Sequence, residues 1–142
     1  MQVPDVNVLI GAFRSDAPAH EVCSRWLNRL VNGDEAYGLS ELACSGFLRI
    51  VTHPRIFNPP DSIEAALKFL ETLRGEPNCV VVTPGERHWS IFADLCRSAG
   101  ARGDLIPDAY FAALAIESGS EWITFDGDYA RFPGLRWHRP TA

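Results

Sequence analysis

Acidic side chains stand at the ends of short apolar runs in this sequence. Asp5, Glu41 and Asp126 each come at or just after the end of such a run, and Asp128 follows two residues after Asp126. Asp108 stands in the first turn of an expected helix. If the runs are strands of a parallel sheet, their carboxyl ends meet at one edge, where the ligand crevice of such a sheet lies. The sequence therefore predicts a cluster of carboxylates at that edge.

A cluster of carboxylates requires a counter-charge. Two carboxylates about 4 Å apart repel each other by about 4 kcal/mol at an effective dielectric constant of about 20. A site made of oxygen ligands, without His or Cys, suits the hard cations Mg²⁺ and Mn²⁺. The chemistry that follows is metal-assisted hydrolysis of a phosphodiester. The histidines are scattered along the sequence, and no Ser-His-Asp or Cys-His arrangement offers a nucleophile instead.

Each acid also has a purely structural interpretation. Asp108 and Glu41 can each stabilise the start of a helix through its dipole, by about 0.3–1 kcal/mol. The segment Asp126-Gly127-Asp128 can form a turn. Asp5 is the hardest acid to explain in this way, because an unpaired charge inside the apolar segment around it is costly. Asp5 is therefore the strongest single candidate for chemistry.

Strands and helices that must position these acids alternate along the chain. Short apolar runs predict strands at residues 2–5, 36–39, 79–83, 122–125 and 135–138. Apolar periodicity and helix boundary signals predict helices at residues 6–13, 20–31, 40–51, 61–75, 86–99 and 107–118. This alternation indicates an α/β fold, with a mainly parallel sheet of about five strands and helices on both faces. The length of 142 residues predicts one domain, residues 1–142.

Some of these elements carry more specific expectations. Ser40 is expected to cap the helix that follows it. The segment Asp61-Ser-Ile-Glu64 has the spacing of a capping box, with its first residue as the N-cap. Pro107 is expected to open the last helix. The β-branched run Cys79–Thr83 is typical of a strand that is buried on both faces.

Composition and charge exclude several classes of protein. The net charge of −5 argues against a protein that coats nucleic acid passively, because such a protein should be basic. No stretch approaches the roughly 18 apolar residues of a membrane span, and the N-terminus lacks the basic region of a signal peptide. The four cysteines form no C-x-x-C pair and are expected to be reduced thiols in a cytoplasmic protein.

The acids and their neighbours together resemble a known family, the PIN-domain ribonucleases of the VapC toxin type. The matching segments are PDVNVLIGAF (4–13), SELACSGFLRIVTHPRIF (40–57), PDAYFAALAIESGSEWITFDGDYARF (107–132) and GLRW (134–137). The match spans nearly the whole chain, with the acids in the same order and spacing. One departure is Pro4, where such proteins usually carry an aliphatic residue, and the first strand is expected to end early there. The resemblance implies a PIN-like, Rossmann-like fold.

The resemblance also implies roles for individual residues. The catalytic acids would be Asp5, Glu41, Asp108 and Asp126. Of these, Asp5, Asp108 and Asp126 would bind the metal, while Glu41 would hold a second metal or orient and deprotonate the attacking water. The residues expected to support the cluster are Asn7, Thr124 and Asp128. One metal ion and two metal ions both remain open.

Partners follow from the same resemblance. The substrate would be RNA, and a small antitoxin protein would bind in the acidic crevice. The chain would form a homodimer or a toxin–antitoxin hetero-oligomer. The helices at 20–31 and 61–74 could supply a dimer surface, although a role in the core is equally open.

Arginines and aromatic side chains could bind the RNA. Arginines that could bind phosphates around the crevice are Arg49, Arg55, Arg87, Arg97, Arg102 and Arg131. Arg55, in the segment His53-Pro54-Arg55, is the strongest of these candidates. Phe57, Trp89 and Tyr129 are possible stacking platforms for unpaired bases.

Two other classes of function compete with this interpretation. A phosphatase of the haloacid dehalogenase type also begins with a strand that ends in Asp, but it needs a second Asp where this chain has Asn7, and the only lysine, Lys68, stands in mid-helix. A non-catalytic module of the same fold could bind RNA or protein, and the intact set of acids argues against it. Metal-dependent cleavage of RNA separates an enzyme from such a module.

Overall fold

A five-stranded parallel sheet forms the centre of the computed structural model, which describes residues 1–141. The strands are β1 (Gln2–Pro4), β2 (Tyr37–Ser40), β3 (Cys79–Val82), β4 (Glu121–Ile123) and β5 (Trp137–His138). The helices are α1 (Val6–Phe13), α2 (His20–Asn32), α3 (Glu41–Val51), α4 (Ile63–Gly75), α5 (His88–Ala99) and α6 (Leu105–Glu117), and a short 3₁₀ helix, η1, spans Gly127–Arg131. The α/β fold class predicted from the sequence is confirmed.

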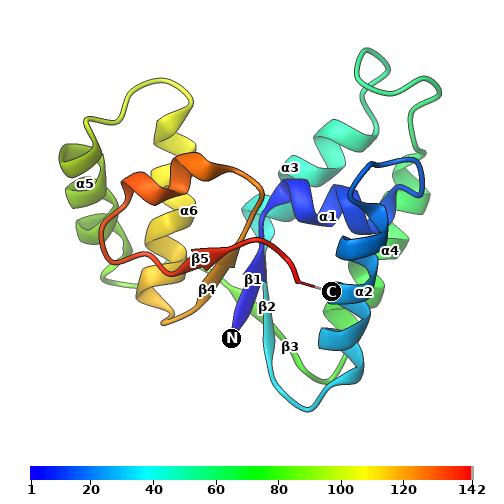
Figure 1. Cartoon of the computed structure of the whole chain (residues 1–142), viewed down its shortest axis with the longest axis horizontal. Coiled ribbons are helices and arrows are strands. Elements are labelled where there is room, and N and C mark those ends of the chain that lie inside the picture. Colours follow the sequence, from blue (N-terminus) through cyan, green and yellow to red (C-terminus); the bar gives the residue numbers. More distant parts are fainter. Residues whose placement is uncertain (142) are drawn as a thin grey trace.

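The strand order β3-β2-β1-β4-β5 places the first strand at the centre of the sheet. From β1 the chain winds outward through β2 to β3 and then returns to the other side of β1 to form β4 and β5. The helices α1 to α4 lie to one side of the sheet, and α5 and α6 lie to the other (Figure 1). The order therefore reverses between β1 and β4, which is where ligands bind in sheets of this kind. No helix within residues 1–141 is long and apolar enough to cross a membrane.

β1 and β4 are bound to each other over their whole length and slightly beyond it. Gln2, Val3 and Pro4 pair with Glu121 to Ile123 in parallel register. Strand β1 ends at Pro4, as expected, but the Asp5 N–H still donates to the Ile123 carbonyl at 2.8 Å. Pro4 thus shortens the strand without separating Asp5 from β4.

β3 differs from the sequence prediction. The run of β-branched residues was expected to be buried on both faces, but β3 is an edge strand, and Val80 and Val81 are 42% and 36% exposed. Only Val82 of this strand is buried. The prediction was wrong because a run of valines records β propensity, whereas burial also depends on the place of the strand in the sheet.

Helix starts follow the sequence in part. Ser40 caps α3 as expected, with its Oγ accepting a hydrogen bond from the Ala43 N–H. The N-cap of α4 is Ser62, which accepts from Ala65, so the expected capping residue Asp61 is off by one. Helix α6 begins at Leu105 rather than at Pro107. Proline is tolerated there because N–H groups in the first turn have no partner within the helix.

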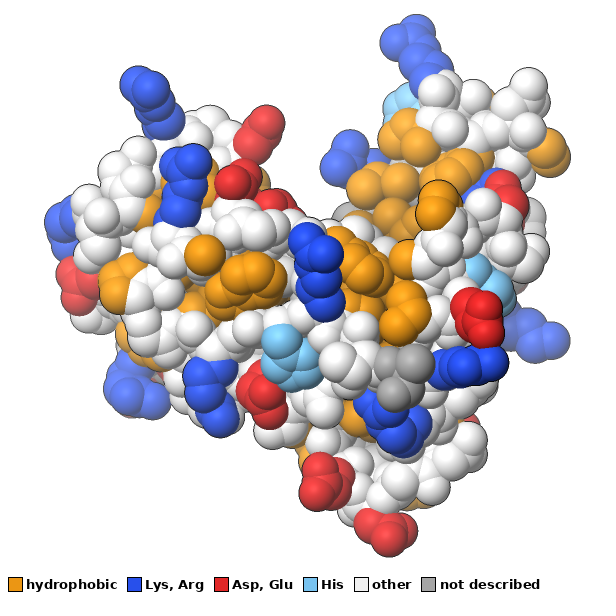
Figure 2. Space-filling view, in the orientation of Figure 1, with side chains coloured by type: hydrophobic (Ala, Val, Ile, Leu, Met, Phe, Trp, Pro, Cys, Tyr) orange, Lys and Arg blue, Asp and Glu red, His pale blue; other side chains and the backbone are white. Residues whose placement is uncertain are grey.

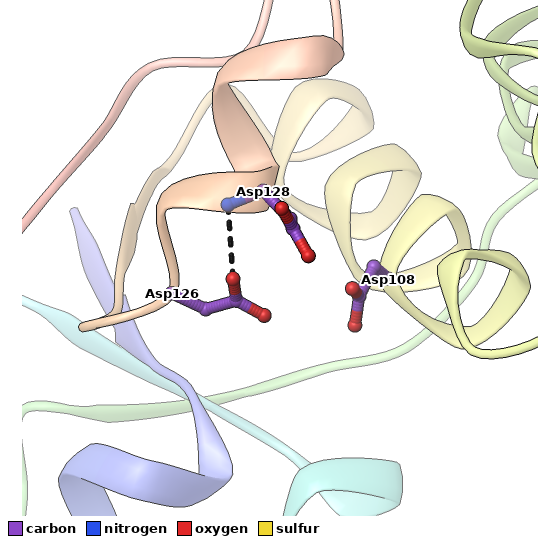
Figure 3. A group of neighbouring side chains, drawn as sticks. All are labelled: Asp108, Asp126 and Asp128. Atoms are coloured by element: carbon purple, nitrogen blue, oxygen red, sulfur yellow. Dashed lines mark hydrogen bonds between the residues drawn. The ribbon is translucent and has the colours of Figure 1, made fainter.

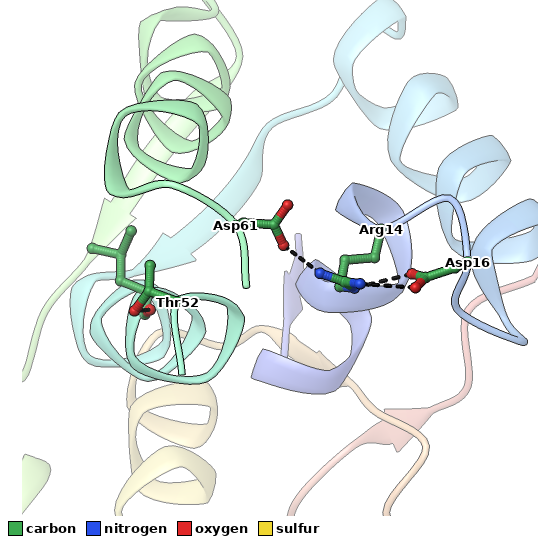
Figure 4. A network of polar contacts seen from close by, with 5 residues as sticks. Arg14, Asp16, Thr52 and Asp61 are labelled. Carbon is green, nitrogen blue, oxygen red and sulfur yellow. Dashed lines mark hydrogen bonds and ion pairs between the residues drawn. The ribbon is translucent and has the colours of Figure 1, made fainter. Parts of the chain in front are cut away.

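Asp61 belongs to a polar network that fixes the segment between α3 and α4 (Figure 4). Arg14, just after α1, donates to Asp61 Oδ2 at 2.6 Å and to the two carboxylate oxygens of Asp16 at 3.0 and 2.8 Å. Its guanidinium also lies 3.7 Å from the centre of the Phe57 ring. The Arg14 side chain is only 12% exposed and that of Asp61 27% exposed, whereas that of Asp16 is 66% exposed. The contact with Asp61 is therefore partly shielded from water and stabilises the segment more than a surface ion pair does.

We predict that Arg14→Ala destabilises the protein by about 1–2 kcal/mol and exposes this segment to proteolysis. Trypsin should then cleave the variant faster after Arg55, which lies in the released segment. The measurements are thermal melts and the time course of that cleavage. Arg25→Ala, which breaks an exposed pair on α2, is the control and should change stability by less than about 1 kcal/mol. Equal cleavage rates after Arg55 in Arg14→Ala and the wild type would contradict the prediction.

Candidate metal centre

Three carboxylates come together beside the sheet (Figure 3). Asp108 is on α6, Asp126 precedes η1, and Asp128 is within η1. One oxygen atom from each lies within 4.8 Å of the others. The Asp128 N–H donates to Asp126 Oδ1 at 2.9 Å, so that η1 is capped by a residue of the cluster itself. The second oxygen of Asp126 remains available for a ligand.

Asp5 lies at the end of β1 and is only 7% exposed. Its Oδ1 accepts from the Val6 N–H at 2.6 Å and so caps α1. Its Oδ2 accepts from the Thr124 hydroxyl at 2.7 Å. The hydroxyl oxygen of Thr124 accepts in turn from Asn7 Nδ2 at 3.2 Å and from the Asp126 N–H at 3.0 Å. The Thr124 side chain thus links Asp5 to the backbone of Asp126.

Asn7 completes this link between the two central strands. Its Nδ2 donates to Thr124 and, at the longer distance of 3.5 Å, to Asp5 Oδ2. Its Oδ1 accepts from the Phe125 N–H at 3.3 Å. The structure therefore places Asn7 and Thr124, two of the three residues expected to support the cluster, in hydrogen-bond contact with Asp5.

Two adjoining cavities share Asp108 and Asp126. The first, of about 460 Å³, is also lined by Asp5 and is called the Asp5 cavity. The second, of about 530 Å³, is also lined by Asp128 and is called the Asp128 cavity. The space-filling view shows a deep notch between two lobes, with acidic side chains on one wall (Figure 2). The aspartates therefore lie where a ligand can reach them from two sides.

Glu41 and Arg55, the other two sequence candidates, line neither of these cavities. The Glu41 carboxylate forms an ion pair with Arg74 Nη1 at 2.7 Å and lines a separate cavity of about 350 Å³ at the end of β2 and β3. Arg55 is exposed in the segment between α3 and α4. The structure thus brings together Asp5, Asp108 and Asp126, adds Asp128 to them, and leaves Glu41 apart.

Burial and mutual repulsion perturb the acids. The pKa of Asp108 is raised to about 6, first by burial and then by the charge of Asp126, and the hydrogen bond from Tyr129 opposes the rise. Burial also raises the pKa of Asp5, against the hydrogen bonds from Thr124 and Val6. Two neighbouring acids therefore both disfavour the ionised state when no cation is bound.

Packed aromatic side chains lie next to the cluster and support it. Tyr129 is 1% exposed, and its hydroxyl donates to Asp108 Oδ1 at 3.2 Å. Its ring lies 5.8 Å from that of Trp122, which stacks on Phe111 at 5.0 Å. The Trp122 indole N–H has no hydrogen-bond partner within residues 1–141. Because Trp122 is completely buried and lines neither cavity, it supports the site by packing rather than by contact with a ligand.

The donor set fits a hard divalent cation. Mg²⁺ binds oxygen at about 2.0–2.1 Å, which places two of its ligand atoms at most about 4.2 Å apart. The oxygens of Asp108, Asp126 and Asp128 lie within 4.8 Å of one another, so the three carboxylates would have to rotate closer together to bind one ion directly. The pKa of Asp108 is raised by burial and, second, by the charge of Asp126. A bound cation would stabilise the ionised form of this carboxylate against both causes.

A family comparison agrees with this arrangement. The model of the PIN domain family matches residues 3–135. The chain belongs to the PIN domain family. This PIN domain is 40% identical to ribonuclease VapC43 of Mycobacterium tuberculosis over 96% of this chain and 92% of the relative. It is 39% identical to ribonuclease VapC25 of the same organism, over 96% of each.

Solved structures share the fold of this PIN domain at low sequence identity. VapBC2 from Rickettsia felis, bound to a promoter DNA fragment, superposes with a TM-score of 0.71 over 97% of each chain, at 13% identity. VapC20 of Mycobacterium tuberculosis, a toxin that cleaves the sarcin-ricin loop, superposes with a TM-score of 0.65 over 96% of this chain and 99% of that chain, at 15% identity. The fold derived from the residues is thus the fold of the family.

Two contacts of these residues could not be predicted from the sequence. The hydroxyl of Tyr129 contacts Asp108 across 21 residues of sequence, and the partner of Glu41 lies 33 residues away. The sequence held one usable signal, since an aromatic residue follows Asp128 directly, but nothing in it indicates that its hydroxyl contacts Asp108.

We predict that Asp108→Asn stabilises the metal-free PIN domain by about 1 kcal/mol at pH 7, a rise of roughly 2–5 °C in melting temperature. The pKa of Asp108 is raised in the folded state to about 6 from its ordinary value of 3.8. The folded state therefore binds more protons, and the contribution of this group to stability falls as pH rises from about 4 to about 6. Thermal melts in chelator across this pH range should show a larger fall in the wild type than in the variant, which keeps only the contribution of Asp5, whose pKa is also raised.

Mg²⁺ provides the control for the same pair of proteins. It should stabilise the wild type by mass action and the Asn variant much less. A variant that melts below the wild type in chelator, and that responds equally to Mg²⁺, would identify Asp108 as a helix-stabilising residue only.

We predict that Tyr129→Phe weakens Mn²⁺ binding about three- to tenfold while the fold is retained. The change removes one hydroxyl, and a hydrogen bond of this kind contributes about 0.5–1.5 kcal/mol. Calorimetric titration of the metal-free protein with Mn²⁺ measures the effect. Tyr37→Phe is the matched control, because its buried hydroxyl donates to the Leu73 carbonyl at 2.6 Å and lines neither cavity. Equal Mn²⁺ affinities in the two variants would contradict the prediction.

Proposed function

We propose that this chain is a Mg²⁺-dependent endoribonuclease, with Mn²⁺ as an alternative cation, and that it is the toxin of a toxin–antitoxin pair. The observation that carries the proposal is the group of three carboxylates at the point where strand order reverses, together with buried Asp5. The names of the relatives support RNA as the substrate, since VapC43 and VapC25 are ribonucleases.

The residues of the site would have different roles, according to the cavities that they line and the hydrogen bonds that they form. Asp108 and Asp126 face both cavities and would hold the cation, with Asp5 and Asp128 on either side. A bound cation would offset the charge of the phosphodiester and favour the ionised form of a bound water. Thr124 and Asn7 would hold Asp5 in place through the hydrogen bonds described above. In the reaction, a water oxygen gives up a proton and bonds to phosphorus, the bond between phosphorus and a ribose oxygen breaks, and that ribose oxygen takes up a proton.

Glu41 is proposed to act on the water or on a second cation. In the structure its carboxylate is paired with Arg74, so this role requires the carboxylate to leave that partner. Both side chains of the pair are about half exposed, and exposed pairs of this kind contribute about 0–1 kcal/mol. Little free energy therefore opposes the movement. Arg55 stays a proposed contact for RNA on the basis of the sequence.

Partners and location follow from the family. The pairing with an antitoxin is supported by VapBC2 from Rickettsia felis and by VapBC from Salmonella typhimurium, which was solved bound to DNA. The assembly would be a homodimer or a toxin–antitoxin hetero-oligomer. The match over residues 3–135 supports a single PIN domain across the chain. The four free cysteines are consistent with a cytoplasmic location.

Two alternatives remain distinguishable from this proposal. A phosphatase of the haloacid dehalogenase type would need an acid where Asn7 instead bridges Asp5, Thr124 and Phe125. A non-catalytic RNA- or protein-binding module would have no need for a half-buried cluster of acids in which burial and neighbouring charge raise the pKa of Asp108. Both alternatives predict no metal-dependent cleavage of RNA.

We predict that Asp108→Asn lowers RNA cleavage by at least about 100-fold at saturating Mg²⁺, because losing a charged group at the reacting centre costs several kcal/mol of transition-state stabilisation. The measurement is the cleavage rate of a mixed single-stranded RNA pool by the purified chain. Asp94→Asn is the matched control, since Asp94 is an exposed acid paired with Arg97 on α5 and should be neutral.

Full activity of Asp108→Asn, or an inactive wild type with both Mg²⁺ and Mn²⁺, would reject the nuclease. The toxin assignment is tested by expressing the same two proteins in bacterial cells and measuring growth. Wild type expressed alone should arrest bacterial growth, and Asp108→Asn should not. Normal growth with soluble, active wild type would remove the toxin assignment and leave the nuclease.

A further inference from the structure

Most arginines of this chain are occupied by partners within the protein. Seven of the twelve form ion pairs or hydrogen bonds through their guanidinium groups; these are Arg14, Arg25, Arg29, Arg74, Arg87, Arg97 and Arg136. Within residues 1–141, no such partner is found for Arg49, Arg55, Arg102, Arg131 or Arg139. Three of these five line the two cavities that contain the aspartates. The guanidinium groups without partners are thus concentrated at the site.

The two cavities differ in how these arginines are placed. Arg102 and Arg131 line the Asp128 cavity together with Asp104 and the carboxylates. Arg49 lines the Asp5 cavity, where most other lining side chains are apolar. Neither Arg102 nor Arg131 pairs with the nearby aspartates in the described part of the chain, although opposite charges favour it. Their donors are therefore free for a ligand that enters the cavity.

The local backbone fixes where Arg102 stands. It lies between Gly100 and Gly103, which adopt positive φ angles of 59° and 58°. Gly100 ends α5, and the Ala101 N–H donates to the Cys96 carbonyl at 2.8 Å. On the other side, the Leu105 N–H donates to the Arg102 carbonyl at 3.2 Å. The short loop is thus tied to both helices and presents Arg102 at the rim of the cavity.

Arg131 is placed by the element that carries the acids. It is the last residue of η1, which Asp126 caps at its start and which also contains Asp128. Tyr129 and Phe132 of the same segment are buried. Arg131 therefore cannot move far from the carboxylates, because the residues on both sides of it in the chain are anchored in the core.

RNA must overcome repulsion to reach this site. The chain carries a net charge of −5, and several of its acids surround the reacting position. The charge of a divalent cation at the aspartates would be offset by the aspartates themselves, and the cation would contact one phosphate only. The neighbouring phosphates need separate positive groups, and the planar guanidinium fork matches a phosphate with two hydrogen bonds. Free arginines on both sides of the aspartates meet this need.

We propose that Arg102 and Arg131 bind the RNA phosphates next to the cleaved one on the side of the Asp128 cavity, and that Arg49 binds a phosphate on the side of the Asp5 cavity. The RNA strand then crosses the aspartates from one cavity to the other. This proposal rests on the proposed function and assigns substrate-binding residues to the same site.

Salt dependence of RNA binding tests the proposal. The probe is a fluorescein-labelled single-stranded 12-nucleotide RNA, bound in Mg²⁺ to protein with the Asp108→Asn change, so that it is not cut. Fluorescence anisotropy gives the affinity from about 50 to 300 mM KCl. Each phosphate contact adds about 0.7 to the slope of log affinity against log salt for a single strand. Replacing Arg102 and Arg131 together by Ala should lower the magnitude of this slope by about 0.7–1.4 and weaken RNA binding at least about tenfold near 100 mM salt.

Matched variants separate specific contacts from general charge. Arg49→Ala should lower the slope by about 0.7. Arg25→Ala with Arg29→Ala removes two charges from α2, whose arginines line neither cavity, and should leave the slope within about 0.3 of its starting value. Replacing Arg102 and Arg131 by Lys should keep the slope but not the full affinity, because Lys retains the charge without the fork. Thermal melts verify that each variant is folded.

An unchanged slope in the Arg102 and Arg131 double variant, or an equal loss in the α2 control, would overturn the proposal. This failure is distinct from failure of the proposed function. If the otherwise wild-type chain cleaves RNA while the double variant keeps the full slope, the nuclease stands and the phosphate contacts are rejected. If the slope falls as expected while the wild type never cleaves RNA, the contacts stand and the nuclease is rejected.

Discussion

The hydroxyl of Thr124 is the contact on which the rest of the site depends. It donates to Asp5 at the end of β1 and accepts from Asn7 and from the backbone of Asp126 after β4. A hydroxyl has one donor and two acceptor positions, so all of its capacity is used. The two central strands diverge at this point, and the hydroxyl holds together the segments that carry the acids. The spacing of the aspartates therefore depends on a neutral side chain that is itself completely buried.

The position of the acids at this point of the fold lowers the stability of the metal-free protein and favours binding of a cation. Strand order reverses between β1 and β4, which leaves a crevice lined by aspartates on one side and supported by Trp122 and Tyr129 from below. Low exposure raises the pKa of Asp5 and Asp108. The large buried core offsets the cost of this arrangement. A bound cation turns the repulsion into attraction, so the free energy stored in the metal-free cluster favours metal binding.

Much of this could be predicted from the sequence, and the failures have physical causes. Asp5 and Asp126 were predictable because an acid after an apolar strand falls at a sheet edge whatever the details of packing. The exposure of β3 was not, since four adjacent strand residues look alike at the centre and at the edge of a sheet. Asp61 was misassigned as a cap because its partner, Arg14, lies 47 residues away. Glu41 has the right position in the sequence, yet its ion pair with Arg74 depends on how α4 returns beside α3.

The capping of η1 by Asp126 has an evolutionary consequence. One oxygen of this carboxylate accepts the Asp128 N–H, and that task needs only an acceptor, which an asparagine side chain also supplies. The other oxygen is free for a cation, and asparagine would offer an amide nitrogen or a neutral oxygen there. Asp and Asn codons differ by a single base, so one nucleotide change would remove the free carboxylate oxygen while an acceptor for the Asp128 N–H is kept. Under the proposed function, a descendant of this gene with that change would be folded but inactive.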